Sequence, residues 1–356
     1  LMKGNEAIGE AAIRAGCRYF FGYPITPQNE LPAYMARRLP QEGGVFLQAE
    51  SEISAINMVY GAAGSGARVM TSSSSPGISL KQEGISYIAG AELPCLIVNI
   101  MRGGPGLGGI QPGQADYFQA TKGGGHGDYH PIVLAPSTIQ ELADLVMEGF
   151  DLADLYRNPV MVLGDGMLGQ MMEPVSFGGY TGRTLPPKDW AATGKPADRK
   201  PNIINSLFID PKELEDRVLH IYEKYETIKE KEVQYETYRC EDAEVIIAAY
   251  GTMARVVKNV IDKAAAEGLR VGLIRPVTLW PFPYDVFAQW AAKPHVKAFL
   301  SVEMSMGQMV EDVRLGVNGQ KPVYFYGRTG GMVPEPGAIL AEIKKIAGGE
   351  GDGGGI

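Results

Sequence analysis

The chain has 356 residues, of which 45% are hydrophobic, so it can bury either one large core or the cores of two ordinary domains. Its 41 acidic and 33 basic residues give a net charge of -8, which argues against nucleic acid as a partner. The sequence contains no apolar run of about 18 residues and no signal-like start, so we expect a cytoplasmic protein without a membrane anchor.

The first half of the chain alternates between apolar runs and amphipathic segments. Strands are predicted at residues 19–21, 45–47, 69–70, 95–101, 132–134 and 160–163, and helices at 6–15, 50–63 and 139–155. Such alternation is typical of an α/β fold with a doubly wound parallel sheet and helices on both faces. We therefore expect a first α/β domain over residues 1–175.

The rest of the chain is predicted to contain a linker and a second α/β domain. Within the linker, residues 176–240, the highly charged stretch 211–239 is expected to be a solvated helix. The second domain is expected over residues 241–347, with strands at 245–249, 271–274, 298–302 and 323–325. The glycine-rich end, residues 348–356, is expected to be a flexible tail.

The run Tyr23-Pro24-Ile25-Thr26-Pro27 follows the first predicted strand. Proline fixes its own φ and favours extended geometry in the residue before it. We therefore expect Thr26 to cap a helix whose first residue is Pro27. Because open α/β sheets bind ligands at the carboxyl ends of their strands, the run predicts a binding edge, although a rigid turn without function is an alternative.

Charged residues recur at two further predicted strand ends. Glu50 and Glu52 are expected in the first turn of the next helix, where they either complement the helix dipole or present a carboxylate to a ligand. Arg102 directly follows the very apolar strand at 95–101, and its permanent charge requires a partner such as a carboxylate. A guanidinium in this position is suited to binding a small carboxylate substrate through two hydrogen bonds.

Two strand-end loops could also contact a ligand. Residues 103–130 are rich in glycine and contain no predicted element, which is unusual within a compact domain and often marks a functional loop. These glycines would permit close approach to a ligand or movement of a lid, whereas a simple surface loop is the alternative. The serines at 72–75 either contact a cofactor or form an ordinary turn.

We predict no metal site in this chain. Gly164-Asp165-Gly166 is similar to the start of the magnesium–diphosphate motif of thiamine enzymes, but residues 188–195 lack the asparagines that would complete it. His126 and His130 have no neighbouring ligands in zinc spacing. The three cysteines, at positions 17, 95 and 240, are too scattered for a metal site or a disulfide framework, so any iron–sulfur cluster would lie on another chain.

Together these motifs resemble the alpha subunit of 2-oxoacid:ferredoxin oxidoreductases over essentially the whole chain. The motifs similar to that family's pyrimidine-type thiamine diphosphate domain are Lys3-Gly4-Asn5-Glu6-Ala7, the Tyr-Pro-Ile-Thr-Pro run, Gln48-Ala49-Glu50-Ser51-Glu52, Ser73-Ser74-Ser75-Pro76-Gly77 and Arg102-Gly103-Gly104-Pro105. Those similar to its transketolase-C-type domain are Ala249-Tyr250-Gly251-Thr252, Arg275-Pro276 and Glu303-Met304. Gly109-Ile110-Gln111-Pro112 and the residues at 120–127 are most similar to the branched-chain type, which acts on 3-methyl-2-oxobutanoate (ketoisovalerate).

The resemblance implies a role for individual residues. Glu52 matches the glutamate that bonds the aminopyrimidine N1′ of thiamine diphosphate. It is chosen over Glu50 because Gly61 follows Glu52 at the glutamate-to-glycine spacing of the family. Thr26 and Arg102 match residues that bind the oxo group and the carboxylate of the substrate. Further cofactor contacts are implied for Tyr23, Pro24, Ile25, Ser74 and Ser75.

The resemblance also implies the reaction and the partners. The reaction is the oxidative decarboxylation of a 2-oxo acid with coenzyme A, which gives acyl-CoA and CO2 and passes electrons to ferredoxin. The diphosphate half of the cofactor site belongs to a beta subunit, and Mg²⁺ and [4Fe-4S] clusters belong to partner subunits, including gamma and ferredoxin-like delta subunits. The alternatives are a 2-oxoglutarate-specific subunit, a decarboxylase component that needs no ferredoxin, and a non-catalytic scaffold subunit.

Overall fold

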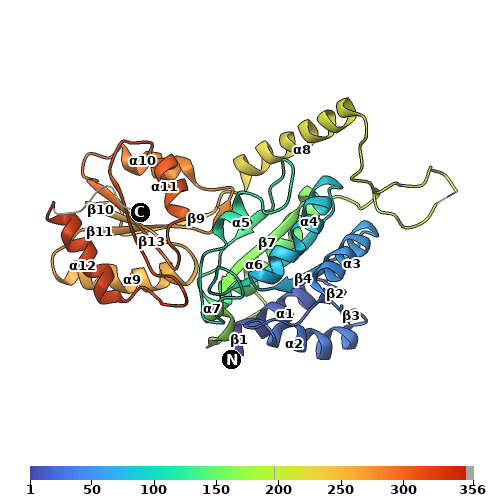
Figure 1. Cartoon of the computed structure of the whole chain (residues 1–356), viewed down its shortest axis with the longest axis horizontal. Coiled ribbons are helices and arrows are strands. Elements are labelled where there is room, and N and C mark those ends of the chain that lie inside the picture. Colours follow the sequence, from blue (N-terminus) through green and yellow to red (C-terminus); the bar gives the residue numbers. More distant parts are fainter. Residues whose placement is uncertain (196, 350–356) are drawn as a thin grey trace.

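The computed structural model describes residues 1–195 and 197–349, which form the strands and helices shown in Figure 1. The strands are β1 (Met2–Lys3), β2 (Tyr19–Gly22), β3 (Val45–Gln48), β4 (Val69–Ser73), β5 (Cys95–Met101), β6 (Ile132–Leu134), β7 (Pro159–Asp165), β8 (Met172–Glu173), β9 (Tyr235–Tyr238), β10 (Val245–Ala248), β11 (Val271–Pro276), β12 (Thr278–Trp280), β13 (Ala298–Glu303) and β14 (Val323–Gly327). The helices are α1 (Gly4–Arg14), α2 (Glu30–Arg38), the 3-10 helix η1 (Leu39–Glu42), α3 (Glu52–Gly64), α4 (Pro76–Gly90), α5 (Tyr117–Thr121), α6 (Ile139–Tyr156), α7 (Gly166–Gln170), α8 (Pro211–Lys231), α9 (Gly251–Ala266), α10 (Tyr284–Ala291), α11 (Met309–Val317) and α12 (Pro336–Ala347).

The larger sheet has the strand order β12-β6-β7-β5-β4-β2-β3, and all of its strands are parallel except β12. From β2 the chain passes to β3 on one side and then returns to β4 on the other side. The strand order therefore reverses between β2 and β4, which is the position where open α/β sheets bind their ligands. The predicted doubly wound α/β fold is confirmed.

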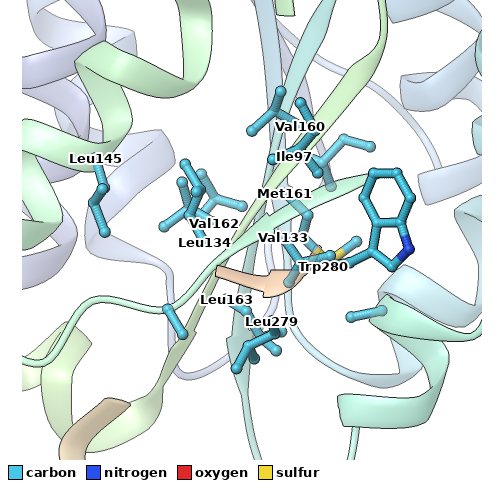
Figure 2. Packing of buried hydrophobic residues seen from close by; sticks show 14 of the residues in the cluster. Ile97, Val133, Leu134, Leu145, Val160, Met161, Val162, Leu163, Leu279 and Trp280 are labelled. Carbon is cyan, nitrogen blue, oxygen red and sulfur yellow. The ribbon is translucent and has the colours of Figure 1, made fainter. Parts of the chain in front are cut away.

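The core of this sheet follows from strands that are buried on both faces. All seven residues of β5 and of β7 are buried, so these strands appear in the sequence as apolar runs interrupted only by Asn99 and by Asp165 at the end of β7. Figure 2 shows Ile97 of β5 beside Val160 and Met161 of β7, with Val133 of the neighbouring β6 close by. Trp280 of β12, more than a hundred residues further along the chain, packs into the same cluster.

The smaller sheet has the order β14-β13-β10-β11-β9, in which β9 is antiparallel to β11. The expected helix over 211–239 ends at Lys231, and residues 235–238 form β9 instead. Alternating aromatic and β-branched residues in Tyr235-Glu236-Thr237-Tyr238 favour a strand, and the edge of β11 supplies its hydrogen-bonding partner. β9 lies within the predicted linker but joins the second sheet, and β12 lies within the predicted second domain but joins the first sheet. The domain limits at residues 175 and 240 stay predictions.

Gln114 connects the two sheets. Its side chain donates to the carbonyl of Tyr250 (3.0 Å) and accepts from the backbone N–H of Met304 (3.0 Å), and its own N–H donates to the Met304 carbonyl (2.8 Å). Nearby, the Tyr117 hydroxyl on α5 donates to Asp312 on α11 (2.6 Å). Figure 1 shows α5 between the two sheets, so the glycine-rich loop belongs to the contact between them.

Two further expectations concern a membrane anchor and the tail of the chain. Within the described part of the chain, none of the helices is both long enough and apolar enough to cross a bilayer. Of the tail expected over 348–356, residues 350–356 lie outside the described residues.

Candidate active site

The predicted site residues lie at the carboxyl ends of four adjacent strands. Thr26 follows β2, Glu52 follows β3, Ser74 and Ser75 follow β4, and Arg102 follows β5. Since these strands are neighbours in the order β5-β4-β2-β3, their loops lie side by side along one edge of the sheet. The edge includes the point between β2 and β4 where the strand order reverses.

The turn after β2 differs from the prediction. α2 begins at Glu30 with Asn29 as its N-cap residue, so Thr26 does not cap a helix and Pro27 does not begin one. The reason is a tertiary contact, because the Pro27 carbonyl accepts hydrogen bonds from Asn5 Nδ2 (2.8 Å) and Gln170 Nε2 (2.9 Å). Thr26 is instead fixed by Asn29, whose Nδ2 donates to the Thr26 hydroxyl (3.2 Å).

Arg102 and Thr26 lie next to each other. The buried guanidinium donates through Nη1 to the Thr26 carbonyl (2.9 Å) and through Nη2 to the Leu107 carbonyl (3.0 Å). Within the described residues, its third nitrogen group, Nε, is buried without a partner. Two backbone carbonyls therefore orient Arg102, while the carboxylate that its charge calls for is not supplied by the described part of the chain.

The Ser75 turn is held in a strained conformation. Ser75 has φ +27°, a value that L-residues rarely adopt. Its hydroxyl donates to Asp116 Oδ2 (2.7 Å) and accepts from the Arg102 N–H (3.0 Å), and its own N–H donates to Asn99 Oδ1 (3.1 Å). Burial raises the pKa of Asp116, the carboxyl at the centre of this network.

Asn99 and Asp116 were not predicted as part of the site. Asn99 is fully buried within the otherwise apolar strand β5, and its Nδ2 donates to Asp116 Oδ2 (2.9 Å). The asparagine within this apolar run could have indicated a polar network in advance, because a buried amide requires hydrogen-bonding partners. The position of Asp116 beside Ser75 and Asn99 depends on the path of the loop after β5, so the residues around Asp116 in the sequence could not predict it.

Glu52 and Glu50 occupy different environments. Ser51 caps α3 by accepting from the Ser54 N–H (3.2 Å), which makes Glu52 the first helical residue and leaves Glu50 outside the helix. Glu52 is buried, whereas Glu50 is exposed and accepts a hydrogen bond from the Ser54 hydroxyl. A Cβ placed at Gly77, at the start of α4, would lie 2.8 Å from Glu52 Oε1. Glu52 therefore points inward, against the first turn of α4.

Several buried polar atoms at or just after the carboxyl ends of β2, β4 and β5 have no partner within the described residues. They are the hydroxyls of Ser73 and Ser74, Nε2 of Gln28 and Nε of Arg102. Ser72 and Ser73, which were expected in a loop, belong to β4, so the loop consists of Ser74 and Ser75. Buried polar groups in native proteins are nearly always hydrogen-bonded, so this set of atoms fits a polar ligand at the strand-end edge.

A cavity of about 480 Å³ opens beside Thr26. Most of its wall is apolar or uncharged, and its lining residues are Thr26, Pro27, Ile110, Gln111, Pro112, Gly166, Met167, Gln170, Gly331 and Val333. Arg102 reaches this wall through a backbone bridge to Pro112. No lysine, arginine or histidine is among these lining residues.

Other predicted features lie at or near this edge. Tyr23 and Pro24 are exposed and Ile25 is half-buried. The loop over 103–130 is not without structure, since it contains α5, and a Cβ at Gly108 (φ +60°) would lie 1.9 Å from the Gly103 carbonyl oxygen. Side-chain volume is therefore excluded where this loop folds back on itself.

The rejected metal sites have other roles in the structure. Asp165 of the Gly-Asp-Gly run caps α7, because its Oδ1 accepts from the N–H groups of Met167 (2.9 Å) and Leu168 (3.1 Å). His130 stacks on Trp280 with ring centroids 4.7 Å apart, and His126 contacts Tyr87 edge-on. Residues 1–195 and 197–349 contain no group of three or more histidine, cysteine, aspartate or glutamate side chains that could hold a metal ion.

Family models match both halves of the chain. A model described as "Pyruvate flavodoxin/ferredoxin oxidoreductase, thiamine diP-bdg" matches residues 10–239, and one described as "Pyruvate:ferredoxin oxidoreductase core domain II" matches residues 243–339. The chain belongs to the pyruvate flavodoxin/ferredoxin oxidoreductase family. It is thus an enzyme subunit of the thiamine diphosphate-dependent 2-oxoacid:ferredoxin oxidoreductase type, as the motifs predicted.

Individual relatives agree with this family. Ketoisovalerate oxidoreductase subunit VorB of Methanothermobacter marburgensis is 51% identical over 348 residues, which cover 98% of both chains. 2-Oxoglutarate synthase subunit KorA of Methanothermobacter thermautotrophicus is 36% identical over 380 residues, covering 97% of this chain and 98% of the relative. The predicted similarity to the branched-chain type is therefore confirmed.

A solved structure shows the same fold. It is 2-oxoglutarate:ferredoxin oxidoreductase from Magnetococcus marinus with 2-oxoglutarate, coenzyme A and succinyl-CoA bound, and it matches with a TM-score of 0.84 and 29% identity. The match covers 97% of this chain but only 64% of that longer chain. A split-gene transketolase in its inactive beta4 tetramer, 14% identical with a TM-score of 0.62, shares the fold alone.

Proposed function

We propose that this chain supplies the aminopyrimidine and substrate half of a thiamine diphosphate site in an enzyme that oxidises branched-chain 2-oxo acids with coenzyme A. The main support is the position of Glu52, Thr26 and Arg102 at neighbouring strand ends beside the reversal of strand order. The full-length similarity to a ketoisovalerate oxidoreductase subunit supports the substrate class.

Glu52 is proposed to bond N1′ of the aminopyrimidine. Its inward-facing, buried carboxyl group can exchange a hydrogen bond or a proton with this ring nitrogen in a site that a partner would close to water. When bound, thiamine diphosphate supplies the nucleophilic carbon that adds to the 2-oxo carbon of the substrate. Further cofactor contacts are proposed for the residues that line the same edge, which are Tyr23, Pro24, Ile25, Ser74 and Ser75.

Arg102 and Thr26 are proposed to hold the substrate. The partnerless Nε of Arg102 and its fixed charge suit the substrate carboxylate, while the Thr26 hydroxyl suits the oxo group. Because the guanidinium is already oriented by two carbonyls, little conformational entropy is lost when the acid binds.

The cavity beside Thr26 favours an aliphatic side chain on the substrate. Ile110, Met167 and Val333 line it, and its wall lacks a cation that could pair with a second carboxylate. A 2-oxoglutarate-specific site, the alternative supported by similarity to KorA, would have to receive that cation from a partner chain.

The remaining cofactors are proposed to lie on partner subunits in the cytoplasm. A beta subunit would hold the diphosphate and Mg²⁺, and gamma and delta subunits would complete the coenzyme A and [4Fe-4S] sites that pass electrons to ferredoxin. The cysteines of this chain support that assignment, since all three are buried and burial raises the pKa of Cys17 and of Cys95 to about 12.

Glu52→Gln in the assembled complex tests the proposal, with Glu50→Gln as the matched control. Reduction of a viologen dye is measured with 3-methyl-2-oxobutanoate and with 2-oxoglutarate in the presence of coenzyme A. We expect Glu52→Gln to lower turnover by roughly 10²-fold or more, the scale of general acid–base catalysis, and Glu50→Gln to leave it unchanged. Equal turnover in the two variants would support a scaffold subunit instead, and a preference for 2-oxoglutarate would overturn the substrate class.

A further inference from the structure

Lys81 is a fully buried lysine that the assignments above do not use. It lies on α4, and its ammonium donates to the Glu52 carbonyl (3.4 Å) and to the Thr71 hydroxyl on β4 (3.1 Å). Lysine is almost never fully buried unless it is paired, and within the described residues no carboxylate forms an ion pair with Lys81. A charge in this position therefore requires an explanation beyond packing.

Two glycines on α4 bring Lys81 close to Glu52. A Cβ at Gly77, one turn before Lys81, would lie 2.0 Å from Ser73 Oγ and 2.8 Å from Glu52 Oε1. A Cβ at Gly84, one turn after it, would lie 2.5 Å from Cγ2 of Ile56 on α3. The missing side chains let α4 approach the first turns of α3, so the Lys81 ammonium lies beneath the helix end that carries Glu52.

The charges of Lys81 and Glu52 act on each other. Burial lowers the pKa of Lys81 to about 8, and the charge of Glu52 works in the opposite direction by favouring the ammonium form. At neutral pH the side chain is therefore still mainly protonated. Within the described residues, Glu52 is the only acidic or basic residue of α3, whose other titratable side chain is Tyr60, and β4 contains no titratable residue.

We propose that Lys81 is a positioning residue that keeps the Glu52 carboxylate ionised when the partner subunit and the cofactor exclude water from the site. This inference rests on the proposed role of Glu52. Exclusion of water favours the neutral form of a carboxyl group, whereas the imino tautomer of the aminopyrimidine carries a proton on N1′ and is stabilised by a charged carboxylate that accepts a hydrogen bond from it. A cation on the protein side of Glu52 opposes that change and leaves the face toward the cofactor free.

The test compares Lys81→Met and Lys81→Gln with Lys224→Met in the assembled complex. Lys224 is a suitable control because its side chain is only 11% exposed and burial lowers its pKa to about 8, but it pairs with Glu92, which precedes β5 and lies at the other end of the strands from the site. Three quantities are measured: kcat and KM for 3-methyl-2-oxobutanoate, the near-ultraviolet circular dichroism of bound thiamine diphosphate, which distinguishes the aminopyrimidine tautomers, and the thermal unfolding temperature.

We expect both Lys81 variants to lower kcat by roughly 10-fold or more, with KM changed less than about 2-fold, and to weaken the circular dichroism signal of the imino tautomer. Lys224→Met should leave kcat, KM and the tautomer signal unchanged. The Gln variant keeps a hydrogen-bond donor at similar volume, so its activity separates charge from packing if the Met variant fails to fold. Wild-type kcat and tautomer signal in Lys81→Gln would overturn the inference, while the effect of Glu52→Gln would still decide the proposed function.

Discussion

Replacement of Arg102 by alanine should mainly weaken substrate binding. The guanidinium uses Nη1 and Nη2 on the carbonyls of Thr26 and Leu107 and has Nε free for the substrate carboxylate. A hydrogen bond to a charged group contributes about 1.5 to 3 kcal/mol, which corresponds to a rise in KM of about 10- to 150-fold. Because this contact forms in the ground state as well as in the transition state, kcat should change much less than KM.

The control for this variant is Arg18→Ala. Arg18 also donates to two backbone carbonyls, those of Ile13 (3.1 Å) and Cys17 (2.8 Å), but it lies before β2, at the opposite edge of the sheet. Steady-state kinetics with 3-methyl-2-oxobutanoate and thermal unfolding should be measured for both variants. If Arg102→Ala lowered stability to the same extent as Arg18→Ala and left KM within about 2-fold of the wild type, Arg102 would only stabilise its loop and our reasoning would be wrong.

Two further predictions concern selectivity and pH. Ile110→Lys adds a cation to the cavity beside Thr26, so kcat/KM for 2-oxoglutarate relative to that for 3-methyl-2-oxobutanoate should rise about 10-fold or more. An unchanged ratio would mean that this cavity does not receive the side chain of the substrate. For Lys224 the lowered pKa means that the unfolded chain binds more protons than the folded chain between about pH 8 and pH 10.5, the ordinary pKa of a lysine. Its contribution therefore raises the free energy of unfolding by up to about 3 kcal/mol across that interval. This gain in the free energy of unfolding should be missing in Lys224→Met. If denaturant unfolding at pH 7.5 and pH 10 gave the same change in the free energy of unfolding for the variant and the wild type, the prediction would be wrong.

The sequence predicted the elements whose signals are local. β5 and β6 begin and end where the sequence predicts, because parallel strands buried on both faces are apolar along most of their length. β12 was missed because it is short and pairs with β6, about 145 positions earlier in the chain. The turn at Thr26 was predicted wrongly because Asn5 and Gln170, from distant elements, take the Pro27 carbonyl that a helix would have needed.

The same distinction holds for the candidate site. Glu52, Thr26 and Arg102 could be proposed because each follows a recognisable strand, and the structure places all three strand ends along one edge. Lys81 was missed although it lies three residues after the buried Ile78 and four before the buried Ile85, on the apolar face of its helix. A lysine at such a position is a usable signal, but its relation to Glu52 depends on how α3 and α4 pack.

The antiparallel pairing of β12 with β6 has a practical consequence for work on shortened versions of this protein. A fragment that stops before Thr278 would retain every parallel strand of the larger sheet but would expose the edge of β6 together with the apolar surface that Leu279 and Trp280 cover. Exposed, hydrophobic strand edges recruit other chains, so such a fragment should self-associate. Expression of the thiamine half alone should therefore include residues 278–280 or a substitute strand.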